Sequence, residues 1–207
     1  RLIVYDDESD PEISASLIER LITEDKIDAL LGGYTTPIVE PQIEVAERHH
    51  IPYVNGGGAA SHIYDKGYRW IFSTLSSGER GAITLMDFIR EQQEEGNLPQ
   101  PLKIAMVWEK SSWGKDCRNG VQQRVGEFPD NFEIVLDESF TEMADDFTPL
   151  LNEVKRADAN VFLSIPHLAD FMLMHRQYIK LGLSHLLVSY GVRGSEEIAR
   201  AEFGTAV

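Results

Sequence analysis

The stretch from Leu30 to Pro37 constrains the fold more than any other part of the sequence. A short apolar run is followed there by two glycines and two threonines, and a helical pattern begins at Pro37. This order is typical of a buried parallel strand that turns sharply into a helix, with Thr36 as the N-cap. Such a turn directs backbone N–H groups and the positive end of the helix dipole out of the sheet's carboxyl edge, where ligands bind. Two roles are therefore open for Thr36, as a helix cap alone or as a ligand contact.

Strand-like and helix-like segments alternate along the rest of the chain. Leu2–Tyr5 has the pattern of a short buried strand, and the dipeptide Asp10-Pro11 marks the start of a helix. Repeated alternation of this kind predicts βαβ units and parallel sheets. The segment at 96–101 contains two prolines and is the best candidate for a linker. We therefore predict an α/β protein of two similar lobes, residues 1–98 and 99–207.

Composition excludes several classes of partner. The net charge of −15 argues against a nucleic-acid partner, because phosphate contacts need clustered Lys and Arg. The same charge disfavours binding to anionic lipid. Cys117 is the only cysteine, so the chain forms no internal disulfide. No apolar run approaches the roughly 20 residues of a membrane-spanning helix.

Motifs for catalysis and for metal binding are also lacking. The sequence has no Gly-x-Ser-x-Gly nucleophile elbow, and Cys117 lies in a helical pattern without an evident activating partner. His49 and His50 are adjacent and would diverge on a helix, and no His-x-x-x-His or Cys-x-x-Cys spacing occurs. We expect no catalytic residue, no metal site and no cofactor.

The glycines between Gly56 and Ser61 follow a second strand-like segment. Their spacing is reminiscent of a dinucleotide-binding fingerprint, but the last glycine is Ser61 here and only a short turn follows. A better interpretation is a backbone left open for close approach by a ligand or by another loop. This loop should end on the same sheet edge as Thr36, so we expect the two loops to face one crevice.

Three residues in the second half of the chain follow predicted strands and are candidate ligand contacts. Trp113 lies at a helix start and is either a core residue or a platform for a ligand. His167 either hydrogen-bonds a ligand or lies in solvent where a helix begins. Arg193 either clamps a carboxylate or is an ordinary solvated charge.

Taken together, the loops resemble those of the type 1 periplasmic solute-binding proteins of the branched-chain amino-acid class, which serve ABC transporters. The resemblance covers the whole chain and depends on the order and spacing of several short pieces. These pieces are Val4–Pro11, Leu31–Pro37, Ile51–Gly57, Arg176-Gln177 and Leu181–Leu183.

The resemblance implies two Rossmann-like lobes joined by a hinge, with a small carboxylate-bearing ligand clamped between them. It also implies presentation of the ligand to a membrane ABC permease, and a periplasmic or extracellular location with or without a lipid anchor. Family members carry a strand and a helix before the point where this chain starts, and further elements after Val207. We therefore expect the chain to be an incomplete, internal portion of such a protein.

The resemblance further implies which loops bind the ligand. First-lobe loops would hold its carboxylate, and second-lobe loops would contact the remainder; the residues implied are Tyr34, Thr36, Ala59, Ala60, Ser61, Trp113 and His167. Arg193 lies at or near the place where amino-acid binders carry an acidic residue for the α-ammonium group. Because a cation cannot pair with an ammonium group, we hypothesise a ligand that lacks a free α-amino group, carries a second carboxylate or is an aromatic acid.

Two other functions are kept open. One is the ligand-sensing domain of a regulator or receptor with the same fold, and the other is a doubly wound α/β enzyme. A basic DNA-binding segment upstream would favour the regulator, whereas a secretory or lipoprotein signal there would rule it out. Turnover of a bound ligand would identify the enzyme.

Overall fold

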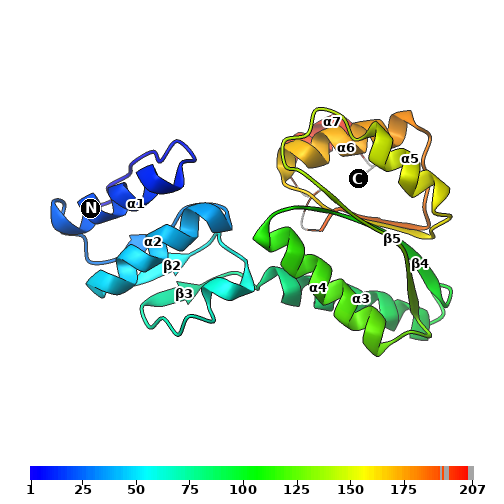
Figure 1. The fold of residues 1–207 in the computed structure, drawn as a ribbon, viewed down its shortest axis with the longest axis horizontal. Helices are drawn as coiled ribbons and strands as arrows, with labels where there is room; N and C mark the ends of the chain where they lie inside the picture. The colour runs from blue at the N-terminus through cyan, green and yellow to red at the C-terminus, as the bar shows by residue number, and fades with distance from the viewer. Residues whose placement is uncertain (192, 194–195, 205–207) are drawn as a thin grey trace. The chain divides into compact units, whose positions relative to one another are not determined.

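The computed structural model describes residues 1–191, 193 and 196–204. It divides into two compact units, Arg1–Gly78 and Glu79–Val207 (Figure 1). Each unit contains a sheet of parallel strands with helices packed against it. The predicted α/β class with parallel sheets is therefore confirmed.

In the first unit, parallel strands pair in the order β1-β2-β3. Its elements are α1 (Pro11–Thr23), β1 (Leu30–Leu31), α2 (Thr36–His49), β2 (Tyr53–Asn55), the 3-10 helix η1 (Ser61–Ile63) and β3 (Ile71–Ser73). Asp10 caps α1 as predicted, because its side chain accepts hydrogen bonds from the backbone N–H groups of Glu12 and Ile13.

The prediction of a buried strand at Leu2–Tyr5 is wrong. This segment has no strand structure, and Leu2 and Val4 are 77% and 75% exposed. Residues 1–5 line a groove of about 780 Å³ together with residues of α1 and β1. A strand needs a hydrogen-bonded neighbour, and in the described part of the chain the ladders of the first sheet join only β1, β2 and β3.

In the second unit, parallel strands pair in the order β5-β4-β6-β7. Its elements are α3 (Gly78–Glu94), β4 (Leu102–Glu109), α4 (Ser112–Glu127), β5 (Phe132–Phe140), α5 (Thr148–Arg156), β6 (Val161–Ile165), α6 (Leu168–Lys180), β7 (Leu187–Ser189) and α7 (Glu197–Phe203). The chain leaves β4 toward β5 on one side and then returns to place β6 on the other side. The sheet therefore has a topological switch point between β4 and β6.

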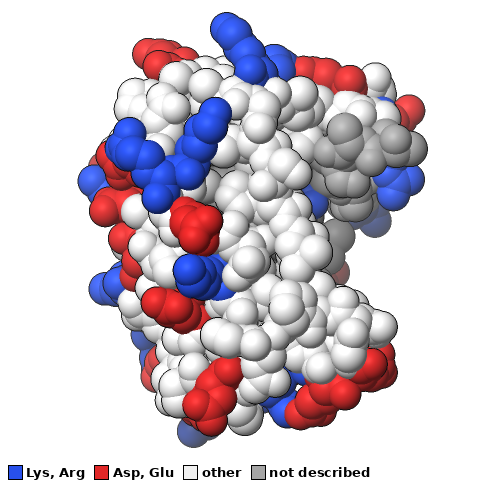
Figure 2. Space-filling model, turned by 90° about the vertical axis from the view of Figure 1, so that its right-hand side faces the viewer, with Lys and Arg blue, Asp and Glu red and all other residues white. Residues whose placement is uncertain are grey.

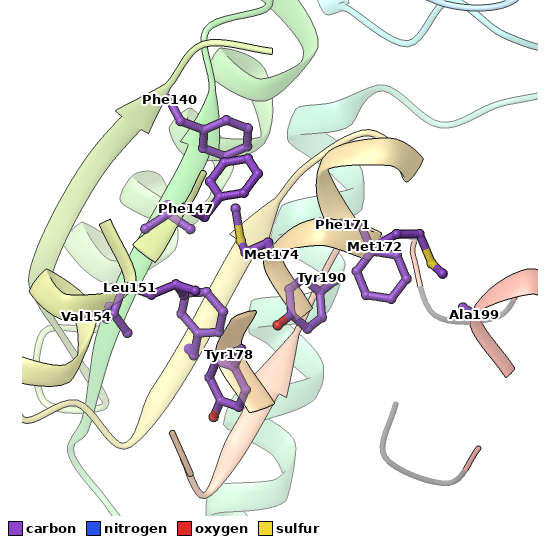
Figure 3. Close-up of a cluster of buried hydrophobic side chains, with 13 residues drawn as sticks. Phe140, Phe147, Leu151, Val154, Phe171, Met172, Met174, Tyr178, Tyr190 and Ala199 are labelled. Atoms are coloured by element: carbon purple, nitrogen blue, oxygen red, sulfur yellow. The ribbon is translucent and has the colours of Figure 1, made fainter. Parts of the chain in front are cut away.

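Alternate side chains of β4 enter two different hydrophobic cores. Ile104 and Met106 pack with α3 and α4, whereas Ala105 and Val107 pack with α5 and α6. The second core is rich in aromatic rings, including Phe140 and Phe147, which meet edge to face (Figure 3). Helices thus cover both faces of the sheet, which is why β4 reads as a continuous apolar run (Figure 1).

The compact units divide before α3, whereas the sequence suggested a boundary between 98 and 99. The reason is the apolar face of α3, where Ala82, Met86 and Ile89 join the core beneath β4. The Pro-rich segment at 96–101 therefore connects α3 to β4 inside the second unit. The two prolines of this segment do mark a connection between two elements, but the compact units divide between Gly78 and Glu79.

Among the described residues, no helix is both long enough and apolar enough to cross a membrane. On the face drawn in Figure 2, Lys and Arg side chains lie next to Asp and Glu side chains.

Two glycines of α4 test the packing of α3. A Cβ on Gly120 would lie 2.4 Å from the Glu79 carbonyl oxygen, whereas a Cβ on Gly126 would meet nothing within 4 Å. We expect Gly120→Ala to lower the free energy of unfolding by about 1–3 kcal/mol through overpacking. Gly126→Ala should raise it by about 0.5–1 kcal/mol, because alanine favours the helix. Chemical denaturation of both variants checks this, and equal stabilities would contradict the packing of α3 on α4.

The acid stability of the second unit should depend on His185. Burial lowers the pKa of His185, and its Nδ1 lies 2.7 Å from the Tyr178 hydroxyl. His185 therefore takes up its proton at a higher pH in the unfolded chain than in the folded chain. The neutral imidazole favours the folded state fully above about pH 6.5, and this advantage is lost as pH falls below that value. We expect His185→Gln to flatten the decline in melting temperature on acidification. An unchanged pH profile in thermal denaturation would contradict this role.

Candidate functional site

The loops that follow β1 and β2 lie against each other at the carboxyl edge of the first sheet. A Cβ on Gly57 would lie 2.2 Å from the carbonyl oxygen of Gly33 and 2.6 Å from the Cα of Tyr34. Only a residue without a side chain permits this approach. The sequence predicted that either a ligand or another loop approaches this glycine backbone closely. The structure shows the loop that follows β1 in this place. The short 3-10 helix η1, which begins at Ser61, agrees with the argument against a dinucleotide-binding turn.

Thr36 joins these two loops. Its buried Oγ1 accepts hydrogen bonds from the N–H groups of Ala59, at 3.3 Å, and Ala60, at 3.2 Å. The prediction that Thr36 is the N-cap is wrong by one residue. Thr35 occupies that position, with φ 71° and no side-chain capping bond. The hydroxyl of Thr36 reaches the neighbouring loop, so it does not cap the helix.

The other first-unit candidates surround this contact. Tyr34 is exposed beside Gly57, and Ser61 begins η1 immediately after the buried Ala60. The structure therefore brings the implied residues of the first lobe to one sheet edge.

Two buried amides, which the sequence analysis missed, hold these loops in shape. Gln42 accepts hydrogen bonds from the Gly33 N–H, at 3.0 Å, and from the Tyr53 hydroxyl, at 2.6 Å. Asn55 accepts from the N–H groups of Gly57 and Gly58. The signal for Asn55 was available, because asparagine directly before glycines is typical of an Asx turn. Gln42 lies inside a helix, where no local pattern indicates its contacts.

The switch point of the second sheet is built around a fully buried carboxylate, that of Glu109 at the end of β4. The Ser111 hydroxyl donates to Glu109 Oε1 at 2.5 Å, and Ser111 Oγ also caps α4 by accepting from the Gly114 N–H. The other carboxylate oxygen, Oε2, accepts the backbone N–H of His167 at 2.9 Å. One side chain thus joins the loops that follow β4 and β6.

His167 and Trp113 lie together beside Glu109. His167 is the N-cap residue of α6, and its Nδ1 lies 2.7 Å from Glu109 Oε2. The Trp113 ring, in the first turn of α4, packs against the imidazole with centroids 5.2 Å apart. The prediction that Trp113 lies at a helix start is confirmed, and the structure brings these two candidates into contact.

Further acidic groups surround the Glu109 carboxylate. Glu142 is an exposed residue, yet desolvation of its carboxyl group raises its pKa, and repulsion from Glu109 adds to the shift. Burial also raises the pKa of Asp170, although the Met143 N–H donates to it. This end of the second sheet is therefore crowded with acceptors. Sequence reasoning missed Glu109 and Glu142 because no spacing rule connects them with each other or with His167, which lies 58 residues from Glu109.

Arg193 is engaged within its own region of the fold. Its Nη1 lies 3.1 Å from Glu196 Oε1, its Nε donates to the Pro166 carbonyl oxygen, and its side chain is 11% exposed. Because Glu196 pairs with Arg193, the hypothesis of a ligand without a free α-amino group stays a prediction. The structure places Arg193 near the loop that carries His167, since Pro166 directly precedes that residue.

The cysteine shows no sign of nucleophilic activation. Cys117 is buried in α4, and burial raises the pKa of its thiol to about 12. A thiol with so high a pKa is protonated at neutral pH and is inert as a nucleophile.

The chain is similar to known binding proteins along most of its length. A family model described as periplasmic binding protein matches residues 1–202. Leu/Ile/Val-binding protein homolog 8 of Brucella abortus is 24% identical over 177 residues, which cover 84% of this chain and 43% of that protein. The family consists of binding proteins rather than enzymes.

Solved structures agree with the fold. A leucine-, isoleucine-, valine-, threonine- and alanine-binding protein from Brucella ovis, in a closed conformation, has a TM-score of 0.81 at 17% identity, covering 97% of this chain and 51% of that one. A solute-binding protein of an ABC transporter from Rhodopseudomonas palustris BisB5 was solved in complex with 3,4-dihydroxybenzoic acid. It has a TM-score of 0.75 at 19% identity, and the match covers 91% of this chain and 50% of that one. The chain spans about half the length of the proteins it matches. These findings confirm the resemblance inferred from the loops, and the chain belongs to the periplasmic binding protein family.

Proposed function

We propose that the protein captures a small carboxylate-bearing solute outside the cytoplasm and delivers it to the permease of an ABC transporter without changing it chemically. The solute is an amino acid or an aromatic acid. What the relatives bind supports this choice, because one is named for branched-chain amino acids and another holds an aromatic acid. The balanced charge of Arg193 leaves both classes open.

The observation that carries the proposal is the N-terminus of α2. Its first turn contains no acidic residue, and its N-cap makes no side-chain bond. The positive end of this helix dipole therefore has no neutralising carboxylate of its own. An anion from the solute can take that place and accept hydrogen bonds from backbone N–H groups.

Thr36 supplies a second contact for the same carboxylate. Its Oγ1 already accepts from the N–H groups of Ala59 and Ala60, so its hydroxyl hydrogen can be donated to the solute. Tyr34 and Ser61 lie beside it as further contacts. Within the second unit, Trp113 and His167 form an aromatic wall with one polar edge, which suits contact with the organic part of a solute.

A matched pair of ligands tests the carboxylate requirement. We expect isoleucine or 3,4-dihydroxybenzoate to bind in isothermal titration calorimetry with one molecule per chain. The corresponding amides, isoleucinamide and 3,4-dihydroxybenzamide, should not bind, because they lack the negative charge. Bound ligand should also stabilise the fold, by about 2.7 kcal/mol at a hundredfold excess over Kd. An amide that binds as tightly as its acid would overturn the proposal.

The second test removes the hydroxyl of Thr36 while keeping its shape. Thr36→Val should weaken carboxylate binding and lower the free energy of unfolding by about 1–3 kcal/mol, because two loop N–H groups lose their acceptor. Thr36→Ser, which keeps the hydroxyl, should restore most of the affinity.

The control for this pair is Thr84→Val in α3. Thr84 is exposed, and its hydroxyl only returns to the Arg80 carbonyl oxygen of the same helix. We expect a change within about 0.5 kcal/mol and an unchanged affinity. If Thr36→Val binds the solute as well as the wild type does, Thr36 has only a structural role.

A further inference from the structure

We propose that the second unit binds a divalent metal ion of the zinc class through Glu109, Glu142 and His167. This goes beyond the proposed function, because the site lies within one unit and requires no solute, although it shares His167 with the proposed solute contacts. Within the described part of the chain, these three residues form the group that can hold a metal ion. One ligand atom from each lies within 4.8 Å of the others.

The three ligands come from three neighbouring strand ends. Glu109 ends the central strand β4, Glu142 follows β5 on one side, and His167 follows β6 on the other side. Parallel strands lie about 4.8 Å apart, so side chains at adjacent carboxyl ends converge on one point. The group therefore follows from the order β5-β4-β6 of the sheet and does not depend on one flexible loop.

The donor set fits zinc better than magnesium. An imidazole nitrogen with two carboxylates suits Zn²⁺, which accepts nitrogen and oxygen ligands in tetrahedral geometry. Three protein ligands would leave a fourth position for water. Magnesium instead requires a nearly octahedral shell of oxygens, which the imidazole does not supply.

The surroundings hold two of the ligands in fixed orientations. The Ser111 hydroxyl and the His167 backbone N–H each donate to the Glu109 carboxylate, and the Trp113 ring packs against the imidazole. Outer contacts of this kind position ligands at metal sites.

The negative charges of Glu109 and Glu142 also favour a bound cation. Glu109 is fully buried, and a buried carboxylate needs a cation or several donors to offset its desolvation. His167 is one such partner, but Glu142 brings a second negative charge to the same place. A divalent ion at this position would offset both carboxylates.

Zinc chloride titrated into untagged, EDTA-treated protein tests the site, with no solute present. We expect one Zn²⁺ per chain by calorimetry and a rise in melting temperature, whereas magnesium chloride should give neither. Glu142→Gln and His167→Gln should each reduce the zinc affinity at least about tenfold. Glu109 is left unchanged, because its loss would remove an acceptor from both loops that it joins.

The matched control is His62→Gln. His62 also lies beside a glutamate, Glu40, at 3.2 Å, but the other carboxylate oxygen of Glu40 pairs with the Lys66 ammonium group at 2.9 Å. This variant should bind zinc like the wild type. The proposal is overturned if zinc produces no binding heat, or if Glu142→Gln and His167→Gln bind it as tightly as the wild type. Solute titrations run in EDTA keep a failure of the proposed function separate from a failure of this site.

Discussion

The contact between Gly57 and the backbone of Gly33 is the constraint on which the first unit's candidate site depends. Parallel strands end at the same edge, but their loops normally keep a side chain's distance from each other. Here the backbones touch, and the contact brings the loop N–H groups of Ala59 and Ala60 within reach of the Thr36 hydroxyl. Any side chain at position 57 would push apart the groups that we assign to the carboxylate.

In the second unit, a buried charged side chain joins the two neighbouring loops. Glu109 joins the loops after β4 and β6 by accepting from Ser111 and His167, in the place where the first unit uses glycines. Its burial has a cost that only donors or cations offset. That requirement explains why the Ser111 hydroxyl and His167 gather around Glu109, whereas Glu142 adds a second negative charge at the same edge.

Local features could be predicted from the sequence, whereas distant ones could not. The strand–helix alternation and the Asp10 cap depend on residues within a few positions of one another, and both were predicted correctly. Leu2–Tyr5 has the composition of a strand, but strand formation also requires a neighbour, which composition cannot supply. The boundary before α3 likewise depends on which core its apolar face joins.

The candidate site divides in the same way. Thr36 was chosen as a candidate because glycine, hydroxyl and proline residues around a strand end form a recognisable turn, and its role in ligand binding stays a prediction. Glu109 was missed because its partner, His167, lies 58 residues away, and no spacing rule connects the two. Arg193 was identified as a charged loop residue, but only the structure shows that Glu196 balances it.

The central claim is that the edge of the first sheet receives a carboxylate. Amide chemical-shift mapping of the protein during titration with isoleucine and with 3,4-dihydroxybenzoate tests this most directly. We predict that the N–H signals of Thr36, Ala59, Ala60 and Ser61 shift together with the acid that binds and stay in place with its amide. An acid that binds while these signals remain unmoved would contradict the account.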